Sequence, residues 1–150
     1  MREIVIVCLA GAIGLAGWTS LAVADLLSAT RPVIAILGAD LYVGVAEGHL
    51  SGAGTLAIHS QIAPEVTCAG EFSSSAALGG AGQLRCSDGA TATFRFQRTD
   101  VFRGHGVGSH SRGSMSFTYG LTADQSVPYL KMPPGKTLWR HGEQLELIDL

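Results

Sequence analysis

The stretch that decides the fold is residues 68–97, CAGEFSSSAALGGAGQLRCSDGATATFRFQ. In its last part, ATATFRFQ, apolar residues alternate with polar ones, which gives one apolar face and one polar face. Alternation of this kind predicts a half-buried β-strand. Cys68 and Cys86 flank a glycine-rich segment, which is compatible with a phosphate-binding loop, a metal site, a redox pair or a disulfide-linked hairpin.

A disulfide-linked hairpin fits these residues best. The glycines are not followed by the Lys and Ser/Thr of a phosphate-binding loop, and no C-x-x-C motif indicates a metal site or a redox pair. If Cys68 faces Cys86 across a hairpin, Phe72 faces Gly82, so the Phe72 ring would lie over bare backbone. We expect a Cys68–Cys86 disulfide, and the alternative is two buried thiols.

The regions on either side of this hairpin have the same character. Residues 33–37 are expected to be a first buried strand, and short apolar or alternating runs continue to residue 119, separated by Gly, Ser and Asp-Gly. The chain contains 20 glycines, which favours turns and close backbone contacts. The sequence therefore predicts a mainly β fold: an antiparallel meander or hairpin-repeat sheet, or a small barrel.

Residues 121–150 have a different pattern. Thr122 and Gln125 have the spacing of a capping box, which predicts one short helix near 122–130 that ends before the Pro-Pro-Gly of residues 133–135. The following residues divide at His141 and Gly142 into two short strands. We expect this final hairpin to close or cover an edge of the main sheet.

Gly-x-Gly pairs recur along the chain. An aromatic or Cys residue two positions before a glycine, followed by Gly-x-Gly, occurs in residues 42–54 and 68–82, and a fainter echo occurs in residues 102–106. Glycines expected to have structural roles are Gly44, Gly54, Gly70, Gly82, Gly89 and Gly106.

The order AGEF, GGAGQL and DG in residues 68–89 resembles the MORN family of β-hairpin repeats. The resemblance implies hairpin geometry. The chain is also similar to small exported or lipid-anchored bacterial proteins in which a CSDG turn precedes an F-x-F strand, and this similarity implies no activity.

An uncharged run of residues 4–24 begins the chain and ends in Ala-Val-Ala. This ending is typical of a cleaved signal peptide, although a run of this length could also remain as a single-span anchor. The predicted organisation is a signal peptide or anchor at 1–24, a linker at 25–31 and a β-domain at 32–150. The expected location is the periplasm, or the periplasmic face of the inner membrane.

Charge and motif content exclude several classes of function. Charged residues make up 15% of the chain and the net charge is −2, so nucleic acid is not an expected partner. No motif indicates a cofactor or a metal site. Residues 104–112 are expected to be an exposed polar loop. A hydrolase built on this loop, with Ser109 or Ser111 as nucleophile, would lack a nucleophile elbow.

A small set of basic residues in the region 95–112 could bind an anionic ligand. The candidate ligand-binding residues are Arg95, Arg98, Arg103, His105, His110 and Arg112. No catalytic residue is assigned. The preferred hypothesis is an exported, disulfide-linked binding or scaffolding module without catalytic activity, with a protein or an envelope component as partner. The alternatives are a single-span accessory subunit of a membrane protein complex and a hydrolase.

Overall fold

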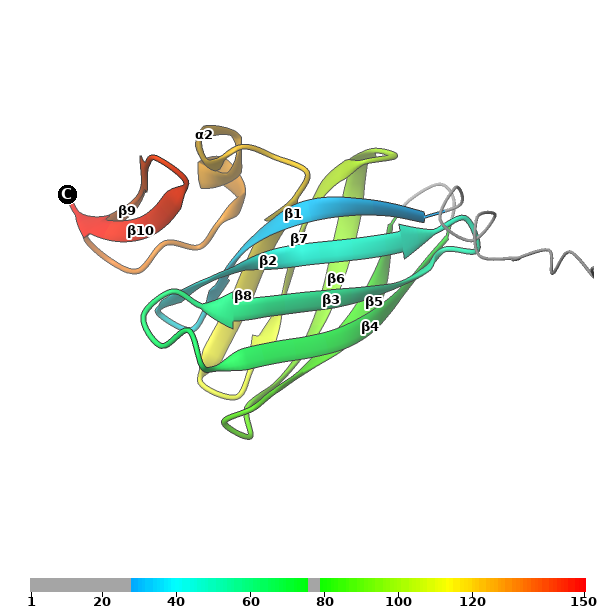
Figure 1. Cartoon of the computed structure of the whole chain (residues 1–150), viewed down its shortest axis with the longest axis horizontal. Helices are drawn as coiled ribbons and strands as arrows, with labels where there is room; N and C mark the ends of the chain where they lie inside the picture. Colours follow the sequence, from blue (N-terminus) through cyan, green and yellow to red (C-terminus); the bar gives the residue numbers. More distant parts are fainter. Residues whose placement is uncertain (1–27, 76–78) are drawn as a thin grey trace, which may run out of the picture.

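The structure is a computed structural model that describes residues 28–75 and 79–150. Eight antiparallel strands form a closed barrel, in which each strand pairs with the next and β8 pairs with β1 (Figure 1). The strands are β1 (Ser28–Leu37), β2 (Asp40–His49), β3 (Ala53–Ser60), β4 (Thr67–Ser75), β5 (Gly79–Cys86), β6 (Thr91–Asp100), β7 (Arg103–His110) and β8 (Gly113–Tyr119). The prediction of a mainly β fold is confirmed.

The predicted signal peptide or anchor at residues 1–24 lies outside the described residues. Within the described part of the chain, no helix has the length and apolarity needed to cross a membrane.

The hairpin of β4 and β5 has the predicted register. Cys68 is paired with Cys86 and Phe72 with Gly82, and a disulfide joins the two cysteines. Opposite residues of antiparallel strands have Cβ atoms only about 4.5–5.5 Å apart, which brings two sulfur atoms within bonding range. Both cysteines are buried among the core residues, so the disulfide links neighbouring strands from inside the barrel.

Aromatic rings inside the barrel lie over glycines of neighbouring strands. A Cβ atom on Gly54 of β3 would collide with the Phe72 ring, and a Cβ on Gly82 of β5 would lie 2.5 Å from Phe94 Cζ. The prediction that the Phe72 ring covers Gly82 is therefore wrong in detail. The Phe72 ring lies over Gly54 of β3 instead, and Gly82 is covered by the Phe94 ring of β6.

Steric or conformational constraints also explain why the remaining glycines with predicted structural roles carry no side chain. A Cβ on Gly44 or Gly70 would collide with the backbone of the neighbouring strand, and one on Gly106 would collide with the Phe117 ring. Gly89 has a φ of 89° in the turn between β5 and β6, a conformation that L side chains rarely adopt.

The structure corrects two predicted boundaries. β1 begins at Ser28, so the last four residues of the predicted 25–31 linker belong to the barrel. Proline is tolerated at position 32 of β1 because this residue pairs with β2 alone, since the ladder to β8 begins at Val33.

Residues 104–112, predicted to be a polar loop, form most of β7 and the following turn. Glycine at the inward positions of β7 hid the alternation that marks a strand.

The C-terminal segment contains the predicted short helix. Thr122 and Gln125 form a complete capping box, in which each side chain accepts a hydrogen bond from the other residue's backbone N–H. Helix α2 (Ala123–Ser126) continues into the 3-10 helix η1 (Val127–Tyr129). Strands β9 (Lys136–His141) and β10 (Gln144–Asp149) then form a separate two-stranded sheet.

This segment packs on the outside of the barrel, away from the end where Ser28 lies (Figure 1). Ile34 and Ile36 of β1 and Leu41 of β2 form a second apolar cluster with Leu130 and Leu138. Because β1 has a strand on each side in the closed barrel, the hairpin covers an outer face. The prediction that it covers a sheet edge is wrong.

Candidate functional site

The two ends of the barrel differ. At the open end, where β1 begins and β2, β4, β6 and β8 finish, the interior forms a cavity of about 790 Å³. This volume lies within the range of about 300–1,000 Å³ that is typical of small-molecule sites. At the closed end, buried side chains that include Leu37, Tyr42 and Met115 fill the interior.

The cavity exists because its opposite walls carry side chains of different sizes. β2 contributes Ala46 and Gly48. β6 lies four strands away in the barrel order, and so faces β2 across the interior with Phe94 and Phe96. The small residues of β2 leave space that the rings of β6 do not fill.

The aromatic wall is a set of interlocked rings. Phe72 meets Phe96 edge to face with centroids 5.5 Å apart, and Phe94 meets Phe117 at 5.1 Å. Phe96 also meets the ring of Tyr119, at 6.0 Å. Edge-to-face contacts of this kind add to the stabilisation from burial. The wall is therefore apolar and held in place from several strands.

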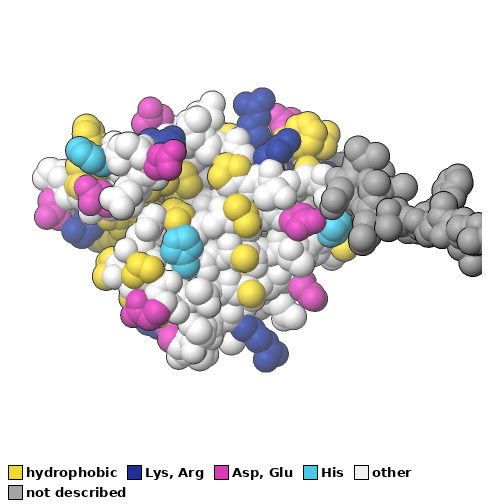
Figure 2. All heavy atoms as spheres, in the orientation of Figure 1, with side chains coloured by type: hydrophobic (Ala, Val, Ile, Leu, Met, Phe, Trp, Pro, Cys, Tyr) yellow, Lys and Arg dark blue, Asp and Glu magenta, His cyan; other side chains and the backbone are white. Residues whose placement is uncertain are grey.

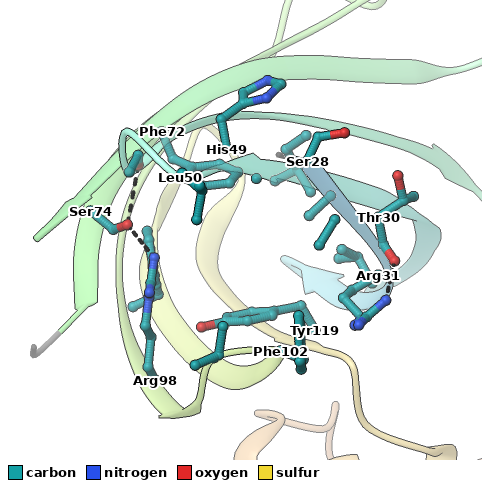
Figure 3. A pocket seen from close by; sticks show the side chains of 18 of the residues that line it. Ser28, Thr30, Arg31, His49, Leu50, Phe72, Ser74, Arg98, Phe102 and Tyr119 are labelled. Carbon is teal, nitrogen blue, oxygen red and sulfur yellow. Dashed lines mark hydrogen bonds between the residues drawn. The ribbon is translucent and has the colours of Figure 1, made fainter. Parts of the chain in front are cut away.

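Arg98 reaches into the cavity from the end of β6 (Figure 3). Its guanidinium donates a hydrogen bond to Ser74 Oγ, and Ser74 Oγ donates one to the carbonyl oxygen of Gly52 at 3.1 Å. None of the ion pairs found among the described residues includes Arg98. A guanidinium has several N–H donors, so the bond to Ser74 uses only part of its capacity.

Tyr119 carries a buried hydroxyl group at the same end. The hydroxyl has no hydrogen-bond partner in the described part of the chain, and in Figure 3 it points toward the Arg98 side chain. Burial raises the pKa of Tyr119, although the Arg98 charge opposes this effect. The hydroxyl is therefore a protonated donor, and leaving it unpaired costs about 1–3 kcal/mol.

The cavity lining carries positive charge. The described residues that line it include Arg31 and Arg98 and no Asp or Glu. Arg31 donates a hydrogen bond to the Thr30 carbonyl at 2.8 Å and stacks on Phe102, 4.3 Å from the ring centroid. Arg31 is thus engaged at the rim, whereas Arg98 points inward.

The turn between β6 and β7 forms part of the rim. Asp100 accepts hydrogen bonds from the backbone N–H of Phe102 and from Arg103, each at 2.8 Å. These bonds lower the pKa of Asp100, with the larger effect from the Phe102 backbone. The carboxylate nearest to Arg98 in the sequence is therefore occupied by Arg103. The rim also exposes Leu50 and Val101, which are 79% and 72% accessible.

Polar groups cover the core at the closed end. Arg112 forms an ion pair with Asp88 at 2.9 Å, and its backbone N–H donates to His110 Nδ1 at 3.2 Å. His110 Nε2 is buried and has no hydrogen-bond partner among the described residues. Burial lowers the pKa of His110, and the Arg112 charge lowers it further.

The six predicted ligand-binding residues do not form one site. Arg98 alone of the six lines the cavity. Arg95 is exposed on the outer face, and Arg103 is paired with Asp100. His105 stacks on Tyr129 with ring centroids 4.2 Å apart, while His110 and Arg112 lie at the closed end. No group of three or more His, Cys, Asp or Glu residues in the described ranges could hold a metal ion.

Sequence reasoning missed most of the cavity. Arg98 has the same strand parity as Phe94 and Phe96, so period-two alternation could have placed it on the inner face. Ser74 shares the parity of Cys68 and could have been found in the same way. The open space itself depends on how eight strands close, and the sequence pattern carries no direct signal for it.

On the surface seen in Figure 2, acidic and basic side chains are scattered over the described residues and form no large patch of one sign. The described lining of the cavity, in contrast, contains Arg31 and Arg98 and no acidic residue.

No family model, curated protein or solved structure matches the chain. The resemblance of residues 68–89 to MORN repeats and the similarity to small exported bacterial proteins therefore stay predictions.

Proposed function

We propose that the protein is a non-catalytic binding module that holds a small, largely apolar molecule in the open end of its barrel. The observation that carries this proposal is the cavity of about 790 Å³, walled by interlocked aromatic rings. Ligand sites are typically concave and mostly apolar, with a few polar groups that set the orientation. The Arg98 and Tyr119 side chains would supply those polar groups.

The rest of the barrel supports this function by keeping the cavity in shape. The disulfide between β4 and β5 and the filled core at the closed end restrain the strands that form the walls. A site that is already formed before binding loses less conformational entropy when the ligand arrives.

Export is part of the same proposal. A disulfide persists in oxidising compartments such as the periplasm, which agrees with the signal-like sequence of residues 4–24. The exposed apolar rim around Leu50 and Val101 would suit contact with an envelope component from which the ligand is taken.

The arrangement of the histidines favours binding over hydrolysis. His105 lies on the outer face of β7 against Tyr129, whereas His110 is buried at the closed end. A hydrolase would need a nucleophile and a base within hydrogen-bond reach of each other. His105 and His110 lie on opposite faces of β7, so they cannot act together in one such site.

Titration with a neutral fluorescent probe, N-phenylnaphthylamine, tests the proposal. We expect its emission to rise on binding to the folded protein. Ala46→Phe should weaken binding by more than tenfold, because the new ring would occupy the cavity. The matched control is Ala57→Phe, which places the same ring on the exposed outer face of the neighbouring strand β3.

The proposal fails if the folded protein does not bind the probe. It also fails if Ala46→Phe and Ala57→Phe bind the probe equally well. Circular dichroism melting of both variants shows whether they keep the barrel.

A further inference from the structure

We propose that the ligand is an amphipathic monocarboxylate, whose carboxylate binds Arg98 and Tyr119 at the open end and whose apolar tail lies against the phenylalanine rings below. This inference rests on the proposed function, because it names the chemistry of a ligand in the same cavity.

The charge of the lining points to an anion. Arg98 lines the cavity, forms no ion pair among the described residues and faces no Asp or Glu in the lining. The nearby carboxylate of Asp100 is held by Arg103 and by the Phe102 backbone. A guanidinium without a carboxylate partner, in a partly buried apolar site, is satisfied best by an anionic oxygen.

The second donor indicates how many oxygens the anion presents. The Tyr119 hydroxyl is buried, protonated and unpaired within the described residues, and it points toward Arg98 in Figure 3. One guanidinium and one hydroxyl match the two oxygens of a carboxylate. A phosphate monoester brings more oxygens and more charge, for which the lining offers only Arg31 in addition, and Arg31 is stacked on Phe102.

The order of residues along the strands sets the orientation of the ligand. Arg98 and Tyr119 occupy the last inward positions of β6 and β8, nearest the open end. Phe94 and Phe117 precede them on the same inner faces and are buried deeper. The head group would therefore stay at the open end while the tail enters the aromatic part of the cavity.

Arg98 also has a structural contact, which the experiment must separate from ligand binding. Its hydrogen bond to Ser74 ties the end of β6 to the end of β4. If this were its whole role, removing the charge would change the stability of the barrel without changing the preference among ligands. The Tyr119 hydroxyl has no hydrogen bond of this kind within residues 28–75 and 79–150.

Displacement of bound N-phenylnaphthylamine by four twelve-carbon compounds tests the inference. The competitors are dodecanoate, dodecanol, dodecylammonium and dodecyl phosphate. We expect dodecanoate to bind about tenfold more tightly than dodecanol, as for a charge-assisted hydrogen bond, and dodecylammonium to bind weakest. Affinity for shorter carboxylates should fall by about fourfold for each methylene removed.

Two variants locate the carboxylate. Arg98→Gln should remove the preference for dodecanoate over dodecanol, while the matched control Arg95→Gln, exposed on the outer face of the same strand, should keep it. Tyr119→Phe should reduce the preference by about fivefold and leave the melting temperature equal or higher, because the lost hydroxyl has no partner among the described residues.

Failure of the two proposals is distinguishable. If the probe itself does not bind, the proposed function is wrong and the inference falls with it. If the probe binds but dodecanoate and dodecanol compete equally, the cavity binds apolar molecules and the carboxylate assignment is overturned. Tighter binding of dodecyl phosphate than of dodecanoate overturns it as well, as does an unchanged preference in Arg98→Gln.

Discussion

At the closed end of the barrel the inward positions carry Leu37, Tyr42 and Met115, whereas at the open end the inward positions of β2 carry Ala46 and Gly48. The strands are continuous between the two ends, and the alternation of inward and outward residues does not change. Along β2 the inward side chains become smaller toward the open end, from Tyr42 to Ala46 and Gly48. The same alternation of inward and outward residues therefore builds a filled core at one end of the barrel and a cavity at the other.

The two ends also differ in how their polar groups are satisfied. At the closed end Arg112 has an acidic partner in Asp88, while at the open end the side-chain partner of Arg98 within the described residues is the neutral Ser74. Each end nevertheless leaves one buried polar atom unpaired within the described residues, on His110 and on Tyr119. We propose that the closed end stabilises the barrel and that the open end binds the ligand.

Truncating one leucine at each end should show the largest difference in stability between the two ends. Leu84 is 1% exposed in the core, and Leu84→Ala should lower the free energy of unfolding by about 2–5 kcal/mol. Leu50→Ala, at the exposed rim, should change it by less than about 0.5 kcal/mol. Urea denaturation measures both values, and similar losses would contradict a division of roles between the ends.

Removing the disulfide should have the next largest effect. Cys68→Ala combined with Cys86→Ala should cost about 3 kcal/mol, because the unfolded chain loses a restraint on its loop. Calorimetry should show a lower melting temperature in the variant. Reduction of the wild type provides a comparison without mutation, and an unchanged melting temperature in both cases would show that the disulfide does not restrain the barrel.

Acid should weaken the closed end through His110. Burial lowers the pKa of His110 in the folded protein. Below pH about 6.5 the imidazole is therefore protonated more readily in the unfolded chain than in the folded chain, and the free energy of unfolding decreases as the pH is lowered. Melting temperatures between pH 7.5 and 5.5 should therefore fall less in His110→Asn than in the wild type. The control His141→Asn, exposed on β9, should behave as the wild type, and equal slopes in all three would exclude His110 as the cause.

Two glycine substitutions on neighbouring strands should change the stability in opposite directions. A Cβ on Gly48, at the open end, would meet Phe72 Cζ at an ordinary 3.9 Å, so Gly48→Ala should stabilise by less than about 1 kcal/mol. Gly54→Ala on the neighbouring strand should destabilise, because its Cβ would collide with the same ring. Thermal melting of the pair compares them directly, and loss of stability in Gly48→Ala would show that the cavity wall is tighter than described.

Local sequence pattern predicted the hairpins better than it predicted the site. The pairing of Cys68 with Cys86 follows from counting residues about the centre of one loop, and the capping box at Thr122 follows from spacing alone. Residues 104–112 were misjudged because glycines replace the apolar residues that normally mark an inner face. The neighbouring strands explain these glycines, because Phe117 of β8 lies over Gly106 and Tyr119 of β8 lies over Gly104.

The cavity could not be predicted for a related reason. Ala46 and Arg98 come from strands that face each other only after β8 pairs with β1, and no local pattern records that closure. The sequence pattern does not distinguish Tyr119 from any other strand residue, because its distinctive feature is a buried hydroxyl without a hydrogen-bond partner among the described residues.

The most direct test is a two-dimensional ¹H–¹⁵N NMR titration of the protein with dodecanoate. If the open end binds the ligand, we expect chemical-shift changes around Ser74, Arg98 and Tyr119, whereas the amides of Ala90 and His110 at the closed end should stay unchanged. Shift changes centred on the closed end, or on the outer hairpin of β9 and β10, would contradict it.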